Sequence, residues 1–126
     1  ERIKIRTEIV NPDVLVVLDP GLLQVGDVMS RLKKEGIAVI NTKKAPEAMK
    51  ADLKAVNKVA VVDAMSIAKE ILGLPIVNTT MIGALIKATG LVKLDSLGEP
   101  MHERFGKVAA KNIEAMRRAY DETVVR

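Results

Sequence analysis

The sequence has 126 residues, 48% of them hydrophobic and 29% charged, which is the balance of one folded globular domain and not of a disordered chain. It contains no cysteine, so disulfides, thiolate metal sites and cysteine-ligated iron–sulfur clusters are excluded within these residues. The net charge of +4 is spread along the chain, and only Phe105 and Tyr120 are aromatic, which disfavours a nucleic-acid module that reads bases by stacking.

The first third of the chain predicts strands alternating with a helix. Residues 3–6 alternate apolar and basic side chains, the period of a half-buried strand. The β-branched run at 14–18, which ends at Asp19, predicts a strand buried on both faces near the centre of a parallel sheet. Apolar residues recur at helical spacing over 25–32, and Gly36 predicts a left-handed end to that helix.

The middle of the chain repeats this alternation. Residues 37–40 predict the next strand, and Pro46 opens a weak helix that reaches residue 53. Residues 59–62 predict a third parallel strand, followed by a short helix over 65–72 that ends at a glycine. Strands that alternate with helices indicate an α/β sheet with right-handed crossovers.

The helix predicted over 81–90 carries a single charge and is apolar nearly all round, so other parts of the protein must cover it. Gly83, Ala84 and Ala88 are spaced so that another backbone can approach closely. Two interpretations remain open. Either the sheet covers one side and an N-terminal portion or a partner subunit covers the other, or the segment is a core helix of this domain.

The last third is predicted to be all helical. Ser96 and Glu99 have the spacing of a capping box ahead of a helix that runs to Phe105. A final helix places one apolar stripe along its length, formed by Val108, Ile113, Met116, Tyr120 and Val124. The expected fold is a single three-layer α/β/α domain over 1–126, with a mostly parallel sheet, a helical C-terminal extension and no N-terminal part of its own.

In an open parallel sheet, ligands bind beyond the carboxyl ends of the strands. Four polar clusters fall there: Asp19-Pro20-Gly21, Asn41-Thr42-Lys43-Lys44, Asp63-Ala64 and Asn78-Thr79-Thr80. Each also has a purely structural interpretation, because Asp19 can satisfy loop amides, Asn41-Thr42 can form a turn, and either threonine can cap the following helix. Together they predict a basic, hydroxyl-rich rim suited to phosphate or carboxylate.

Other functional signatures are weak or missing. Residues 11–20 resemble the phosphoacceptor strand of a response-regulator receiver domain, but no strand ending in an acidic pair precedes them to hold magnesium. His102 is the only histidine and stands beside Glu103 on a short amphipathic segment, where a solvated position is favoured over catalysis. No glycine-rich phosphate loop occurs. No catalytic residue is therefore assigned.

Several segments resemble the gamma subunit of pyruvate:ferredoxin oxidoreductase and of related 2-oxoacid:ferredoxin oxidoreductases. The matching segments are residues 41–44, 61–64, 75–97, 103–105 and 111–115. The resemblance therefore extends along essentially the whole chain. Family members also carry a glycine-rich strand–turn–helix at their N-terminus, which this sequence lacks, so we expect the N-terminal part of the fold to be missing.

The resemblance implies a thiamine-diphosphate enzyme that oxidatively decarboxylates a 2-oxoacid, passes electrons through iron–sulfur clusters to ferredoxin and transfers the acyl group to coenzyme A. It places thiamine diphosphate, magnesium and the clusters on other subunits, so that no cofactor is bound by this chain alone and ferredoxin is an indirect partner. The gamma subunit contributes to the coenzyme A side of the active site.

We therefore expect a subunit of such an oxidoreductase, with other subunits and coenzyme A as partners. The candidate binding residues for coenzyme A are Asn41, Thr42, Lys43, Lys44, Asn78, Thr79 and Thr80. The alternative is a stand-alone doubly wound α/β module that binds a ligand or regulates. No run of about 18 apolar residues and no signal-peptide pattern occurs, so a cytoplasmic location without membrane contact is expected.

Overall fold

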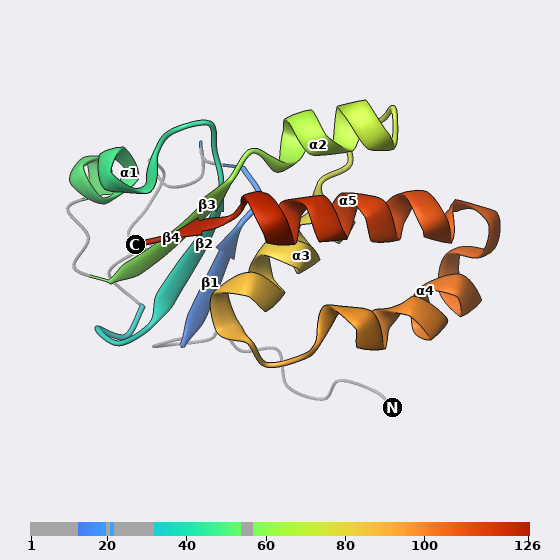
Figure 1. The fold of residues 1–126 in the computed structure, drawn as a ribbon. Helices are drawn as coiled ribbons and strands as arrows, with labels where there is room; N and C mark the ends of the chain where they lie inside the picture. The colour runs from blue at the N-terminus through green and yellow to red at the C-terminus, as the bar shows by residue number, and fades with distance from the viewer. Residues whose placement is uncertain (1–12, 20, 22–31, 54–56) are drawn as a thin grey trace, which may run out of the picture.

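The computed structural model describes residues 13–19, 21, 32–53 and 57–126, and arranges them as a four-stranded sheet with helices on both faces (Figure 1). The elements in chain order are β1 (Val14–Val17), β2 (Ile37–Asn41), α1 (Pro46–Leu53), β3 (Lys58–Val62), α2 (Ala64–Ile71), α3 (Asn78–Thr89), η3 (Leu94–Leu97), α4 (Gly98–Phe105), η4 (Gly106–Val108), α5 (Ala109–Glu122) and β4 (Val124–Val125). The strand predicted over 3–6 and the helix predicted over 25–32 lie outside the described residues.

The sheet has the order β1-β2-β3-β4, with the first three strands parallel and β4 antiparallel to β3. Val14 pairs with Ile37 at the start of β1, and Ile37 pairs in turn with Lys58. The three parallel strands therefore end at one edge of the sheet. Among the described strands β1 lies at the end of the sheet and not at its centre, and Val16 is 38% exposed there.

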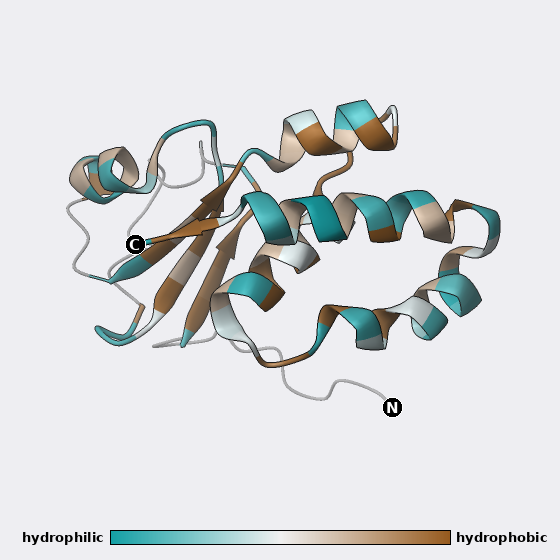
Figure 2. Ribbon diagram, in the orientation of Figure 1, coloured by the Kyte–Doolittle hydropathy of each residue, from teal (hydrophilic) through white to brown (hydrophobic). Residues whose placement is uncertain are grey.

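Alternate residues of the strands face two separate hydrophobic clusters. Val39, Ala60 and Val62 pack with α2, α3 and α5 on one face. Ile40 and Val61 pack on the other face, against a cluster that includes Met49 of α1 and Leu32. Figure 2 shows the strands as predominantly hydrophobic and the helices as hydrophobic in part. The predicted three-layer α/β/α architecture with a mostly parallel sheet is confirmed.

The apolar helix α3 is covered by the sheet and by α5 of the same chain. At Gly83 a Cβ atom would stand 1.9 Å from the carbonyl oxygen of Met116, so the two helix backbones cross in direct contact there. The predicted close approach is therefore correct, and its partner within this chain is α5. Met81 and Ala84 are almost completely buried, whereas Ile82 is 39% exposed. The interpretation as a core helix accounts for most of α3.

The C-terminal third differs from its prediction in three respects. No side chain caps α4, and Ser96 lies within η3, so the predicted capping box does not form. The buried face of α5 consists of Ala109, Asn112, Ala115, Met116 and Ala119, while Val108 is exposed. After α5 the chain returns to the sheet, where Val124 belongs to β4 and not to a helix.

Glycines mark two kinds of constraint. Gly73 and Gly90 have φ values of 71° and 64° and end α2 and α3 in the left-handed region that glycine tolerates best. Gly36 does not have a positive φ, contrary to the prediction. A Cβ there would approach the carbonyl oxygen of Asp13 to 2.8 Å, so close packing and not backbone handedness requires glycine at this position.

Candidate functional site

The ends of the three parallel strands are joined by one side chain. The Asn41 amide nitrogen donates to the Leu18 carbonyl oxygen at 2.9 Å, and its amide oxygen accepts from the Ala64 N–H at 3.0 Å. Asn41 is only 6% exposed, and its hydrogen bond to the Ala64 N–H is buried, while the one to Leu18 is partly buried. The side chain therefore fixes the relative positions of the loops that follow β1 and β3, and its polar atoms point at protein groups.

The turn after Asn41 carries two exposed lysines. The Thr42 hydroxyl accepts a hydrogen bond from the Lys44 N–H at 3.2 Å, and the Thr42 N–H donates to Val62 of β3 at 3.0 Å. The Lys44 ammonium lies 2.5 Å from the Asp52 carboxylate on α1. Among the described residues no carboxylate is within 4 Å of the Lys43 ammonium. The expected turn thus exists, and it holds Lys43 at the surface.

An open pocket of about 450 Å³ lies beside this turn at the carboxyl edge of the sheet. Its lining combines the turn with the start of α1, the end of β3 and the end of α5, and consists of Thr42, Lys43, Lys44, Ala45, Pro46, Val61, Val62, Asp63, Glu122 and Val124. A cavity of this size is in the range that accepts a small molecule or part of a larger one.

The two acidic residues of the pocket are both engaged by the protein. Asp63 caps α2, because its carboxylate accepts from the Ser66 N–H at 3.2 Å and from the Ser66 hydroxyl at 2.7 Å. Glu122 accepts from the Arg118 guanidinium at 2.5 Å. Hydrogen bonds to Glu122 and then to Glu70 raise the pKa of Arg118, which keeps it charged. The negative charge facing the pocket is thereby partly offset.

The second predicted cluster, Asn78-Thr79-Thr80, forms the first turn of α3 and is not part of the pocket lining. The Asn78 side chain is exposed and accepts from the Thr79 N–H at 2.9 Å. Thr79 is 9% exposed, and Thr80 is fully buried, with no hydrogen-bond partner for its hydroxyl in the described part of the chain. Neither threonine caps α3, because the helix begins at Asn78 and its N-cap position is Val77.

The remaining predicted positions have local structural contacts. The Asp19 carboxylate accepts from the Gly21 N–H at 2.9 Å, which is the loop role weighed for it. His102 is exposed, as expected. Among the described residues no group of three or more His, Asp or Glu side chains is placed to hold a metal ion. None of the helices in the described part is long and apolar enough to span a membrane.

The site also contains residues that the sequence did not point to. Glu122 and Val124 reach the pocket because α5 ends there and β4 pairs with β3. The sequence signal for this return is slight, namely two valines after Thr123 at the end of a helical pattern. Only an antiparallel pairing with a strand some 60 residues earlier makes it a site feature.

Comparison with protein families matches residues 1–122 to the model described as pyruvate ferredoxin/flavodoxin oxidoreductase. A relative from Pyrococcus furiosus, named pyruvate/ketoisovalerate oxidoreductases common subunit gamma, is 51% identical over 125 residues, which are 98% of this chain and 68% of the relative. A relative from Methanothermobacter thermautotrophicus, named pyruvate synthase subunit PorC, is 48% identical over 118 residues, which are 93% of this chain and 62% of the relative.

The fold also matches a solved structure. The crystal structure of pyruvate oxidoreductase subunit PORC from Thermotoga maritima superimposes with a TM-score of 0.84 at 35% sequence identity. The match covers 93% of this chain and 66% of that one, so the chain spans about two thirds of the length of the relatives it matches.

Proposed function

Because the chain belongs to the pyruvate ferredoxin/flavodoxin oxidoreductase family, we propose that it is the gamma-type part of an enzyme that oxidises a 2-oxoacid, passes the electrons to ferredoxin and forms an acyl-coenzyme A. The resemblance seen in residues 75–97 is confirmed by this membership. The matched relatives are named as subunits, which favours a complex with other subunits over a stand-alone module. With no cysteine in these residues, a cysteine-ligated cluster of such an enzyme would lie elsewhere in the complex.

Within that enzyme we assign the pocket at the carboxyl edge of the sheet to the phosphate-bearing part of coenzyme A. The observation that carries this assignment is the turn Thr42-Lys43-Lys44, which holds two exposed ammonium groups beside the pocket on a buried strand end. Coenzyme A carries a diphosphate and a further phosphate, and lysine binds such groups as a point charge.

The predicted binding residues take different parts in this proposal. Lys43 supplies an ammonium group directly, whereas Lys44 must exchange or share its contact with Asp52. Asn41 holds the turn in place from below and does not reach the ligand with its own amide. Asn78 has an exposed side-chain amide at the start of α3. The Thr80 hydroxyl is buried inside the protein and does not face the ligand. The Thr79 backbone N–H donates to the Asn78 side chain, so Thr79 offers the ligand no free N–H.

The test is the double variant Lys43→Ala/Lys44→Ala in the assembled enzyme. We expect the KM for coenzyme A to rise about tenfold, because each charge-assisted contact contributes roughly 1.5–3 kcal/mol when fully formed and these lysines are exposed. The KM for the 2-oxoacid is expected to stay constant, and kcat to change little, because the lost contacts act equally in the ground and transition states.

A matched control removes two lysines from the other end of the molecule. Lys107→Ala/Lys111→Ala changes the net charge by the same amount on η4 and α5, where both side chains are exposed. We expect this variant to keep the wild-type KM for coenzyme A. A KM for coenzyme A that stays at the wild-type value in Lys43→Ala/Lys44→Ala would refute the phosphate role. An equal rise of this KM in both double variants would attribute the effect to net charge and would also refute it.

A further inference from the structure

Two residues of opposite charge stand at opposite ends of α1, and the helix itself stabilises neither of them. Lys44 precedes the first residue of the helix by two positions, and Asp52 lies in its last turn. The helix dipole disfavours a cation near the N-terminus and a carboxylate near the C-terminus. The Lys44 ammonium donates to the Asp52 carboxylate at 2.5 Å. Each of the two side chains therefore supplies the charge that the other lacks from the helix.

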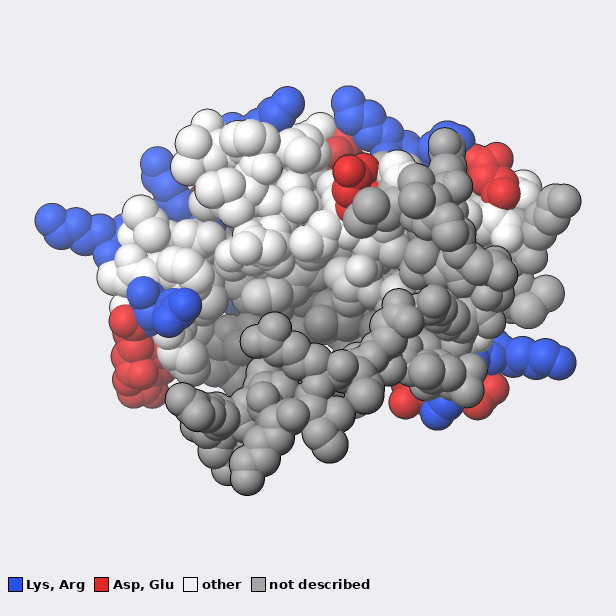
Figure 3. Space-filling view, turned by 180° about the vertical axis from the view of Figure 1, so that it is seen from behind, with Lys and Arg blue, Asp and Glu red and all other residues white. Residues whose placement is uncertain are grey.

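Ion pairs are frequent on the surface of this protein. Figure 3 shows acidic side chains next to basic ones at several places around the face seen from behind. Among the ion pairs of the described residues, that of Lys44 with Asp52 is the only one whose basic member lines the pocket at the carboxyl edge of the sheet. Asp52 itself does not line the pocket. The pair therefore occupies the charge of a pocket residue with a carboxylate from outside the lining.

A ligand can exchange this contact at low cost, because the pair is solvated. The side chains of Lys44 and Asp52 are 59% and 50% exposed. An ion pair in that environment contributes little to stability, since water and salt compete for both charges. The carboxylates of the lining are engaged elsewhere, Asp63 by Ser66 and Glu122 by Arg118. Within the described part of the chain, a phosphate at the pocket thus competes with Asp52 for the Lys44 ammonium.

We propose that Asp52 is a positioning residue that sets the affinity of the pocket for coenzyme A, by competing with the ligand phosphates for Lys44. The inference rests on the proposed function, which supplies the ligand, and it adds an exchange of partners at binding. Lys43 meets the phosphates directly, and Lys44 joins it when the ligand displaces Asp52. The apparent affinity for coenzyme A is lowered because only the unpaired fraction of Lys44 is ready to bind.

The test is Asp52→Asn in the assembled enzyme, which removes the competing charge and keeps the size of the side chain. We expect the KM for coenzyme A to fall about two- to fivefold, the range that corresponds to the strength of an exposed ion pair. Because Asp52 acts through Lys44 alone, kcat and the KM for the 2-oxoacid should keep their wild-type values. The conservative variant Asp52→Glu retains a carboxylate and should keep the wild-type KM for coenzyme A.

Two further variants separate competition for Lys44 from the loss of a negative charge. Asp95→Asn is the matched control, because Asp95 forms an exposed ion pair with Arg117 and does not line the coenzyme A pocket. It should keep the wild-type KM for coenzyme A. In Lys44→Ala/Asp52→Asn this KM should equal that of Lys44→Ala, since no ammonium group is left at residue 44 for the carboxylate to occupy.

An unchanged or higher KM for coenzyme A in Asp52→Asn would overturn the proposal, as would an equal fall with and without Lys44. If Lys43→Ala/Lys44→Ala raises this KM while Asp52→Asn leaves it at the wild-type value, the competition is wrong and the phosphate role of the pocket stands. If neither variant changes the KM, the phosphate role itself is wrong and the competition fails with it.

Discussion

Asn41 shows how a residue in a ligand-facing position can serve the protein itself. It follows the last apolar residue of β2, where a polar side chain predicts a site, yet its amide satisfies a carbonyl from the β1 loop and an N–H from the β3 loop. A buried amide that uses both its donor and its acceptor costs no unmade hydrogen bond and sets loop geometry. Asn41 therefore acts on the pocket by positioning Thr42 and the lysines.

The substitution Asn41→Asp tests this positioning role. A carboxylate can accept from the Ala64 N–H but cannot donate to the Leu18 carbonyl oxygen, so we expect the free energy of unfolding at neutral pH to fall by about 1–3 kcal/mol. Burial would raise the pKa of the new carboxyl in the folded state, so the loss should shrink as the pH falls and the group becomes a donor. Urea unfolding at several pH values measures it.

The control for this substitution is Asn78→Asp, the same chemical change at an exposed position. The Asn78 side chain uses its oxygen to accept from the Thr79 N–H, a role that a carboxylate keeps, and a negative charge is favourable in the first turn of a helix. Its stability at neutral pH should equal or exceed that of the wild type. If Asn41→Asp behaved like Asn78→Asp, the bridging role would be wrong.

At the scale of elements, the crossing of α3 and α5 organises one face of the sheet. Both helices contribute small side chains, and at Gly83 the α3 backbone rests on the Met116 carbonyl of α5. Since a Cβ of residue 83 would overlap that oxygen, Gly83→Ala is expected to lower the free energy of unfolding by about 1–3 kcal/mol or more. Urea unfolding of the wild type and of Gly83→Ala measures this difference in the free energy of unfolding.

Gly98→Ala provides the opposite case on the neighbouring helix α4. A Cβ at residue 98 would meet no atom within 4 Å, and the backbone there is already helical with a φ of −56°. Here the added methyl group should raise stability by about 0.4–1 kcal/mol, because it restricts the unfolded chain. A loss of stability at position 98 as large as that at 83 would show that contact with Met116 is not what matters.

The sequence predicts elements better than it predicts their neighbours. The β-branched runs and the glycines after α2 and α3 locate most strands and helices to within a few residues, because these signals are local. The partner of α3 could not be identified, since the buried face of α5 consists mainly of alanines, with Asn112 and the single large apolar residue Met116, and forms no stripe of large apolar residues. The two-residue strand β4 is too short for any periodic pattern.

Part of the candidate site could likewise be predicted from the sequence, and part could not. That the turn Thr42-Lys43-Lys44 lies at the ligand edge follows from parallel strands, which all end on one side. Two other features depend on contacts between segments distant in sequence. These are the hydrogen bonds that occupy the Asn41 amide and the position of Glu122 at the same pocket. Such contacts are set by packing and leave no local pattern.

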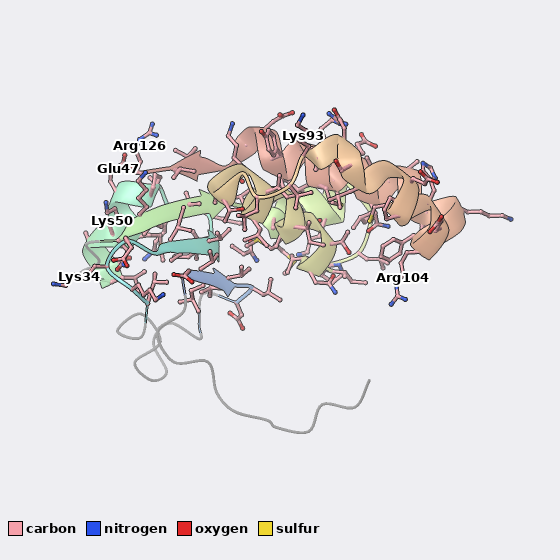
Figure 4. The ribbon with its side chains drawn as sticks, turned by 90° about the horizontal axis from the view of Figure 1, so that it is seen from below. Lys34, Glu47, Lys50, Lys93, Arg104 and Arg126 are labelled. Atoms are coloured by element: carbon pink, nitrogen blue, oxygen red, sulfur yellow. The ribbon has the colours of Figure 1, made fainter. Side chains whose placement is uncertain are left out.

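At the scale of the whole molecule, charge is distributed and not gathered into one stripe. Figure 4 shows Lys50 and Arg126 near Glu47 at one end of the molecule and Arg104 at the other, and the Arg126 guanidinium lies 3.6 Å from the Glu47 carboxylate. Attraction of an anionic ligand must therefore come from a local excess. The pocket lining holds two lysines and two carboxylates, of which Glu122 pairs with Arg118 and Asp63 is bound by Ser66. Lys44 pairs with Asp52, so the local attraction rests chiefly on Lys43, whose ammonium has no carboxylate within 4 Å among the described residues.

This local origin predicts a specific salt dependence in the assembled enzyme. The two lysines are exposed, so raising the ionic strength from about 0.05 to 0.5 M should screen them and raise the KM for coenzyme A roughly three- to tenfold. In Lys43→Ala/Lys44→Ala the same titration should be nearly flat, while Lys107→Ala/Lys111→Ala should retain the wild-type slope because neither of its lysines lines the pocket. Steady-state rates at each salt concentration, with the KM for the 2-oxoacid as internal reference, measure all three slopes. Parallel slopes in the three proteins would mean that the ligand responds to the charge of the whole complex, and the pocket would lose its assigned role.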